Sequence, residues 1–428
     1  MITALDRHKA PALQKAGKLN VIHADKHVLD NGVPLYVVNA GVQDVVRFEI
    51  IFPNSVRTTS AYMHALSAHH LLDSGTAAKD ALAVARGFDN YGAHFESEIN
   101  ADWKTLSLFS LSRLLPETLP LLHELITEAS FPDNELDAWK TRNIQQVKVQ
   151  KGKVSWLARK AFNETLYGSG SLYGFTPAED DFSNVDRNTI TRSFASGYDL
   201  SEAILVLSGK FSDKVIADIN RIFGSVSLSS DNPSQNGTDF SSTAQVPEKK
   251  KIEKADAVQS CIRIGKLLFT KNHPDYQPMT VVSTLLGGYF GSRLMANIRE
   301  DKGYTYGIGC ALSPHRHGGH FFITTETGKA VCADAVREIY SELDRLSTEP
   351  VPADELELVK SYMSGAFQRN IDGPFALADR FKSLILHGLD YQYLEEYQDL
   401  LLSIQPATIT GLAQKWLAPD TMTEIIAG

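Results

Sequence analysis

A short sequence pattern occurs once in each half of the chain and predicts two related domains. Residues 131–137 read FPDNELD, and residues 351–357 repeat the pattern as VPADELE. In each copy the proline opens a helix, because the first helical turn does not need the N–H that proline lacks. A chain of 428 residues also exceeds what one hydrophobic core usually supports. We therefore expect domains at residues 1–224 and 251–428.

The segment between these domains has the composition of a linker. Residues 225–238 are mostly polar, rich in turn formers and without sustained periodicity, so the linker is placed at residues 225–250. Strand-like runs precede amphipathic helices in both halves, at residues 35–38, 45–52 and 260–266. We expect an α+β fold of two homologous halves, each a mostly antiparallel sheet covered on one side by helices.

The composition narrows the class of protein. The net charge is −9 and no Lys/Arg stripe occurs beyond a local one at residues 140–160, which gives little reason to expect nucleic acid as a partner. No apolar run approaches the 18 residues of a membrane span, and the first nine residues lack the apolar segment of a secretory signal. The three cysteines, Cys261, Cys310 and Cys332, are most simply reduced thiols. We expect a cytoplasmic protein without a membrane partner.

Residues 66–76 contain part of a zinc-peptidase motif. They read LSAHHLLDSGT. In the inverted motif H-x-x-E-H, two histidines four residues apart bind the metal and the glutamate polarises the attacking water. Here Leu66, His69 and His70 occupy those three positions. Leucine cannot bind a metal and His69 has no carboxylate to accept the proton from water, so only His70 keeps its residue type.

The surroundings of this motif resemble the active-site helix of the pitrilysin/insulinase family of zinc metallopeptidases, in which Gly-Thr follows the second histidine at the same interval as Gly75-Thr76. Residues 86–97 and 166–174 are similar to later family segments, in the same order. The resemblance spans nearly the whole chain and implies that the two halves face each other as half of a clamshell. It also implies a third zinc ligand, a glutamate on a second helix.

Gln145 and Gln146 stand where that third ligand is implied. No Asp or Glu occurs from residue 138 to residue 163, so a shift of register supplies no carboxylate. The alternative for this region is a solvated basic face. Apolar residues at helical spacing support it, because they indicate a helix whose other side is in water, and these residues are Val154, Leu157, Ala158, Ala161 and Phe162. Both interpretations exclude zinc bound in the usual way.

Two other groups of histidines are candidate metal sites. One is a reassigned set at helical spacing, His64, His69, His70 and Asp73, although histidines in such surroundings are more often packed or hydrogen-bonded. The second is the cluster of residues 315–320, HRHGGH, whose Gly-Gly pair favours a surface hairpin turn. We therefore expect no metal in this chain.

The second informative pattern lies at residues 287–307. Four residues mark a helix and its end, namely Leu294, Ile298, Lys302 and Gly303. Three residues then alternate as one face of a strand, namely Tyr304, Tyr306 and Ile308. Arg299 and Tyr306 are seven residues apart, so they are expected to meet across the turn from helix to strand.

With its lead-in Gly291-Ser292-Arg293-Leu294, this pair resembles the arginine and tyrosine that the family brings to the zinc site from its non-zinc half. The resemblance implies that Arg299 and Tyr306 bind the substrate carbonyl and the oxygen that gains charge in the transition state, since both are hydrogen-bond donors. The ordinary alternative is an arginine at a helix surface and a half-buried tyrosine in a sheet.

Three functions follow from this combination. The first is a catalytically incomplete subunit that pairs with a homologue bearing the intact zinc motif, or forms a homodimer, and contributes Arg299 and Tyr306 to hydrolysis of an extended peptide. Zinc is then expected in the partner and no cofactor in this chain. The second is a non-enzymatic peptide-binding or scaffold protein of the same fold. The third is a self-sufficient peptidase with altered metal ligands.

Overall fold

The first half forms a six-stranded sheet in the computed structural model, which describes residues 18–228 and 246–428. The strand order is β1-β2-β6-β3-β5-β4, and only β2 and β6 pair in parallel. The strands are β1 (Asp25–Val28), β2 (Pro34–Asn39), β3 (Val45–Pro53), β4 (His94–Ile99), β5 (Trp103–Leu111) and β6 (Ile204–Gly209). The expected strands at residues 35–38 and 45–52 are therefore confirmed.

The second half forms a five-stranded sheet in the order β7-β11-β8-β10-β9, with β7 and β11 parallel and the other pairs antiparallel. Its strands are β7 (Lys249–Ile252), β8 (Gln259–Leu268), β9 (Ile308–Pro314), β10 (Gly319–Gly328) and β11 (Thr423–Ala427). Each sheet thus contains one parallel pair in an otherwise antiparallel arrangement. The α+β fold of two similar halves is confirmed.

One face of each sheet is covered by helices from the same half of the chain. In the first half these are α2 (Ala81–Asp89), α3 (Leu115–Glu128) and α8 (Asp213–Phe223), while α1 (Thr59–His70), α4 (Asp133–Lys151), α6 (Glu179–Ser183) and α7 (Arg187–Ala195) form a second layer. In the second half they are α9 (Tyr276–Ser283), α10 (Cys332–Thr348), α11 (Ala353–Arg369), α13 (Gln392–Ser403), α14 (Pro406–Trp416) and the π-helices η3 (Thr284–Gly288) and η4 (Met295–Asp301).

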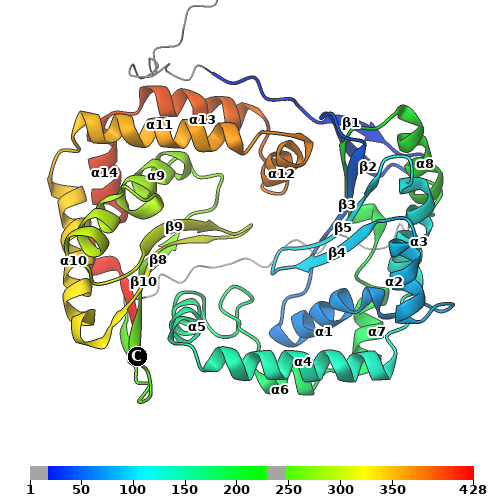
Figure 1. The fold of residues 1–428 in the computed structure, drawn as a ribbon, viewed down its shortest axis with the longest axis horizontal. Coiled ribbons are helices and arrows are strands. Elements are labelled where there is room, and N and C mark those ends of the chain that lie inside the picture. The colour runs from blue at the N-terminus through cyan, green and yellow to red at the C-terminus, as the bar shows by residue number, and fades with distance from the viewer. Residues whose placement is uncertain (1–17, 229–245) are drawn as a thin grey trace, which may run out of the picture.

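The other face of each sheet is covered by a helix from the opposite half (Figure 1). Helix α12 (Pro374–Ile385) places Leu377 and Ala378 against Val38, Ile51 and Val206 of the first sheet. Helix α5 (Val154–Tyr167) packs apolar residues, including Ala158 and Phe162, against Cys261, Ile425 and Ala427 of the second sheet. The expectation of helices on one side only is therefore wrong, because the two halves exchange a helix.

Most of the proposed linker, residues 229–245, lies outside the described residues, as do residues 1–17. Strand β7 begins at Lys249, inside the range proposed for the linker. All three cysteines are free and buried, as expected for reduced thiols. Among the described residues, no helix combines the length and the apolar character that crossing a membrane requires.

Candidate functional site

The residue at the position of the motif's glutamate, His69, is part of the core. It lies near the end of α1, which begins after Thr58, whose hydroxyl accepts a hydrogen bond from the N–H of Ala61. His69 is fully buried, with Nε2 at 3.2 Å from the carbonyl oxygen of Thr105 and Nδ1 at 2.8 Å from the hydroxyl of Tyr198. A carbonyl only accepts hydrogen bonds, so Nε2 carries the proton and Nδ1 accepts from Tyr198. Neither nitrogen is available to a metal.

The buried imidazole of His69 is neutral. Burial is the main cause that lowers its pKa to about 3, and the charges of His70 and Lys104 lower the pKa further. The hydroxyl of Tyr198 is buried with it, and burial raises the pKa of that phenol. His69 therefore acts as a hydrogen-bonded structural group that ties α1 to β5 and to the segment after α7.

The other positions of the zinc motif do not come together as a metal site. Leu66 packs against an apolar cluster that contains Met63, and Ile144 and Phe175 pack against the same cluster. His70 is exposed, with its ring 6.4 Å from that of Trp139, and Gln145 and Gln146 are exposed on α4. Within the described residues, no group of three His, Cys, Asp or Glu side chains is arranged to hold a metal ion, and this includes the set His64, His69, His70 and Asp73.

The basic region at residues 138–163 is divided between two helices. Lys148 and Lys151 on α4 form ion pairs with Glu179 of α6, at 4.0 and 2.9 Å. Helix α5 has one polar side, as expected, but its apolar side packs against the second sheet. The carboxylate that pairs with these two lysines thus belongs to Glu179, which lies outside residues 138–163.

The histidine cluster at residues 315–320 is not a surface turn. Residues 315–318 do connect β9 to β10, but the tip packs into the first half. His320 is buried, with Nδ1 at 2.8 Å from the hydroxyl of Tyr167, and the ring of His315 stacks on that of Tyr173 at 4.2 Å. The N–H of Arg316 donates to the carboxylate of Asp102 at 3.0 Å. The predicted hairpin turn is confirmed, but its placement on the surface was wrong, because the partners of the tip are more than 130 residues away in sequence.

Arg299 is carried by η4, whose apolar side is buried as expected, with Leu294 and Ile298 inaccessible. The helix ends at Lys302, and Gly303 follows with φ of 65°, a conformation that glycine adopts without strain. The helix is of the π type, which is frequent at functional sites. The expected helix and its end are thus confirmed, although its hydrogen bonding differs from that of an α-helix.

The strand after this helix begins later than predicted. Strand β9 starts at Ile308, so Tyr304 and Tyr306 precede it. Side-chain hydrogen bonds hold the segment instead: the hydroxyl of Thr305 accepts from the N–H of Gly307 at 3.1 Å and donates to the carbonyl of Glu326 at 2.8 Å. The predicted strand start was wrong because these bonds replace strand pairing.

Arg299 and Tyr306 line one open cavity of about 720 Å³. The guanidinium of Arg299 lies 4.6 Å from the ring centre of Phe290, which is exposed, and its ion pair with Glu300 is long, at 3.9 Å. The side chain of Tyr306 is 96% exposed. Among residues 18–228 and 246–428, those that line the cavity all lie between Gln259 and Gly328, so the described part of the first half contributes none of its walls. The donors of the pair are therefore open to solvent.

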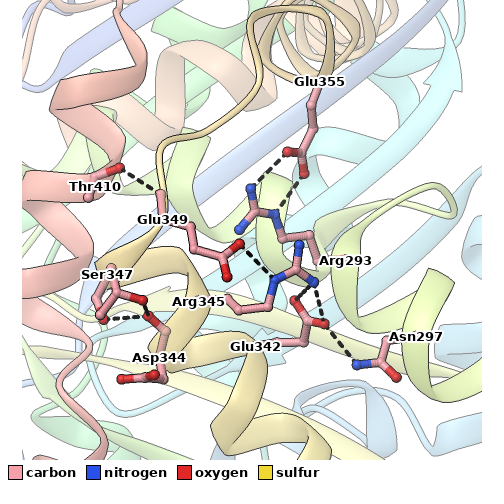
Figure 2. Close-up of polar contacts among 10 residues, drawn as sticks. Arg293, Asn297, Glu342, Asp344, Arg345, Ser347, Glu349, Glu355 and Thr410 are labelled. Atoms are coloured by element: carbon pink, nitrogen blue, oxygen red, sulfur yellow. Dashed lines mark hydrogen bonds and ion pairs between the residues drawn. The ribbon is translucent and has the colours of Figure 1, made fainter.

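Charged residues of α10 and α11 contact η4 and the residues just before it, and Figure 2 shows these contacts. Arg293 forms two hydrogen bonds of 2.8 Å to the carboxylate of Glu355. Asn297 donates to Glu342 at 2.8 Å, and Arg345 pairs with the same carboxylate at 3.1 Å. This network fixes the helix that presents Arg299. The sequence pattern placed Arg293 only in the lead-in to this helix and did not predict its pairing with Glu355. The sequence signal that could have pointed to Glu355 is its position in the repeated VPADELE segment.

Known proteins are similar to this chain in sequence and in fold. Residues 184–363 match the family model described as "Peptidase M16 inactive domain". Over 406 residues the chain is 21% identical to the Bacillus subtilis (strain 168) protein named "Uncharacterized zinc protease YmxG", which covers 94% of this chain and 98% of that protein. It is 21% identical over 240 residues to the Helicobacter pylori (strain ATCC 700392 / 26695) protein named "Non-peptidase homolog YmxG", with 56% of this chain and 55% of that one covered.

A solved structure has the same fold. The crystal structure of a peptidase M16 inactive domain from Pseudomonas fluorescens superposes with a TM-score of 0.82 at 21% sequence identity, covering 95% of this chain and 98% of that chain. The resemblance seen in the sequence is therefore confirmed at the level of the fold.

Proposed function

We propose that this chain, which is similar to the pitrilysin/insulinase (M16) peptidases in sequence and in fold, is a catalytically incomplete subunit that works with a zinc-bearing homologue. In this proposal the partner supplies the zinc motif and the present chain supplies Arg299 and Tyr306. The pair then helps to hydrolyse an extended peptide. The name "zinc protease" given to the B. subtilis relative does not fit the residues at positions 66, 69 and 70 here.

The observation that carries the proposal is the one-sided cavity at Arg299 and Tyr306. Both residues line it, Tyr306 is almost fully exposed, and no described residue of the half that contains His69 and His70 contributes to its walls. A site completed within one chain would bring the two halves together around the pair. Here the opposite wall is left for another polypeptide, and a second copy or a homologue can supply it.

The chemistry of the pair suits peptide hydrolysis. The guanidinium presents several fixed N–H donors and the phenol presents one O–H donor, so together they can hold a substrate carbonyl and the oxygen that gains charge in the tetrahedral intermediate. Zinc in the partner supplies the activated water. We expect the peptide to lie as an added strand on the partner's sheet edge, because main-chain pairing accepts most sequences.

The test is complementation between two purified chains. The present chain is mixed with a homologue that carries the intact zinc motif, and cleavage of an unstructured fluorogenic peptide is followed. Replacing the pair, Arg299→Ala with Tyr306→Phe, should lower kcat by about 10²-fold or more if the donors act in the transition state. The matched control is Arg337→Ala with Tyr91→Phe, which removes an exposed arginine of the second half and the hydroxyl of a partly exposed tyrosine of the first half. Unchanged cleavage with the first pair removed would refute the catalytic role.

A binding or scaffold role is the second candidate, and the printed name of the H. pylori relative, "Non-peptidase homolog", favours it. Under that role the Arg299/Tyr306 double variant supports the partner as well as the wild type does.

Metal analysis separates both candidates from a peptidase with altered ligands. We expect well under one zinc per chain in the pure protein and one zinc per pair in the complex, whereas stoichiometric zinc in the chain alone would contradict the incomplete-subunit proposal.

A further inference from the structure

A second cavity lies among helices of the second half, away from the Arg299 site. Its volume is about 440 Å³, within the range of small-molecule sites. Helices α9, α11, α12 and α13, which surround it, lie close together at the top of Figure 1. Its walls are largely aromatic and apolar, with side chains that include Tyr276, Tyr362, Tyr393, Tyr397, Met363 and Phe367.

Two cations line this apolar cavity. Lys271 is only 9% exposed, and its ammonium donates to the carbonyl of Ser383 at 2.9 Å and to the hydroxyl of the same residue. It also lies 5.7 Å from the ring centre of Tyr393. The guanidinium of Arg380 lies 5.7 Å from the ring centre of Phe367 and has no hydrogen bond or ion pair with any described residue. Both side chains thus bring positive charge to a wall that also contains four tyrosine rings and one phenylalanine ring.

No carboxylate compensates these charges within the cavity, since none of its lining residues in the described part of the chain is Asp or Glu. The acids nearest in sequence are engaged elsewhere: Asp379 with Arg47 and Lys382, and Asp275 with Lys415. Burial lowers the pKa of Lys271 to about 8, with a smaller effect from the charge of Arg380, and burial also lowers the pKa of Arg380. Keeping two unpaired cations in such surroundings costs free energy that an anion would recover.

We propose that this cavity binds a small organic anion, whose carboxylate or phosphate lies between Lys271 and Arg380 and whose flat apolar body lies among the tyrosine rings. The planar guanidinium forms paired hydrogen bonds with either head group, and the ammonium adds a second charge. Tyrosine rings supply apolar surface together with hydroxyl donors. The lining is formed mainly by helices. Among the described lining residues only Pro314 belongs to an edge strand, β9, and proline has no N–H to pair with a peptide backbone, which points to a small molecule.

The first experiment compares probes that differ in charge, in head group or in the presence of an apolar body. Isothermal titration calorimetry of the full chain at pH 7 is carried out with 3-phenylpropanoate and its neutral amide, with phenyl phosphate, and with inorganic phosphate alone. We expect at least one aryl anion to bind. The affinity of the amide should be at least about tenfold lower, because hydrogen bonds to charged groups are the strong ones. The affinity of inorganic phosphate should also be at least about tenfold lower, because it has no apolar body. Binding of only the carboxylate or only the phosphate identifies the head group. Equal binding of the amide, or no binding of either aryl anion at millimolar concentration, would overturn the proposal.

The second experiment locates the site. Arg380→Gln removes the charge and should weaken the aryl anion about tenfold or more, whereas Arg380→Lys keeps the charge but loses the paired hydrogen bonds and should weaken the anion less than Arg380→Gln does. The matched control is Arg369→Gln, an exposed arginine on α11 that does not line the cavity, which should leave affinity unchanged. Melting curves of all variants separate loss of binding from loss of fold. Equal affinity of Arg380→Gln and wild type would show that the anion binds elsewhere.

Discussion

The guanidinium of Arg47, on the first sheet, lies 2.7 Å from the carboxylate of Asp379, on the helix that the second half contributes to that sheet. Arg47 also pairs with Glu49 at 3.0 Å, and Lys382 pairs with Glu49 at 2.5 Å and with Asp379 at 2.8 Å. Charges of opposite sign therefore alternate between β3 and α12. Because Arg47 and Glu49 are buried, this network fixes α12 on a sheet that belongs to the other half.

Removing Arg47 should destabilise the protein far more than neutralising Asp379. Arg47→Ala leaves Glu49 buried with one partner fewer and should lower the free energy of unfolding by about 3 kcal/mol. Asp379→Asn should cost less than about 1 kcal/mol, because the Asp379 side chain is 54% exposed and Arg47 keeps Glu49. Urea unfolding at pH 7 measures both. Equal losses would show that the buried part of the network contributes no more than its exposed end.

His69 provides a test of why the family's glutamate cannot simply be restored. In His69→Glu, a carboxylate would be buried against the carbonyl of Thr105, which offers no proton, so we expect a loss of about 3 kcal/mol at pH 7. His69→Gln keeps one donor for Thr105 and one acceptor for Tyr198, and should lose only about 1 kcal/mol. Thermal unfolding measures the difference, and a stable Glu variant would show that α1 can turn this position toward solvent.

The local features of this fold could be predicted from the sequence. The alternation and apolar content of residues 45–52 gave a strand that the structure extends by one residue, to Pro53. Leu294 and Ile298 were correctly placed on the packed side of a helix that ends before Gly303. Both repeats of the proline-led pattern do open helices, at Asp133 and Ala353. In each case neighbours in sequence set the backbone conformation.

Features set by distant contacts could not be predicted. Nothing near His320 in sequence shows that Tyr167 of the other half will bury it, and the exchange of α5 and α12 between halves leaves no local pattern. The start of β9 was misplaced because Thr305 and Thr325 hold the preceding segment with side-chain bonds. The roles proposed for Arg299 and Tyr306 came from the family resemblance, and they remain a prediction.

Acidification should destabilise the protein through buried His320. Burial first, and then the charges of His315 and Arg263, lower its pKa to about 3. The unfolded chain therefore binds a proton at this residue before the folded chain does, so stability is full above about pH 6.5 and is lost as the pH falls toward 3. His320→Gln can still bond to Tyr167 but does not titrate, so the slope of unfolding free energy against pH should decrease by up to about 1.4 kcal/mol per unit.

The control for this pH dependence is His94→Gln, at an exposed histidine on β4. Urea unfolding at intervals from pH 7 to pH 4 gives the slope for each variant. If His320→Gln and His94→Gln change the slope equally, the buried histidine does not cause the acid sensitivity.

The bidentate pair between Arg293 and Glu355 should be needed to position Arg299. Glu355→Gln removes the charge that pairs with the buried Arg293 and should lower the free energy of unfolding by about 2 kcal/mol. In the two-chain assay proposed above it should also lower kcat at temperatures well below melting, without weakening association of the chains, because η4 is then held less firmly. The matched control on the same helix is Glu357→Gln, an exposed residue paired with Lys360, which should cost less than about 1 kcal/mol. If both variants lower kcat alike, or if neither does, the Arg293–Glu355 pair has no special part in presenting Arg299.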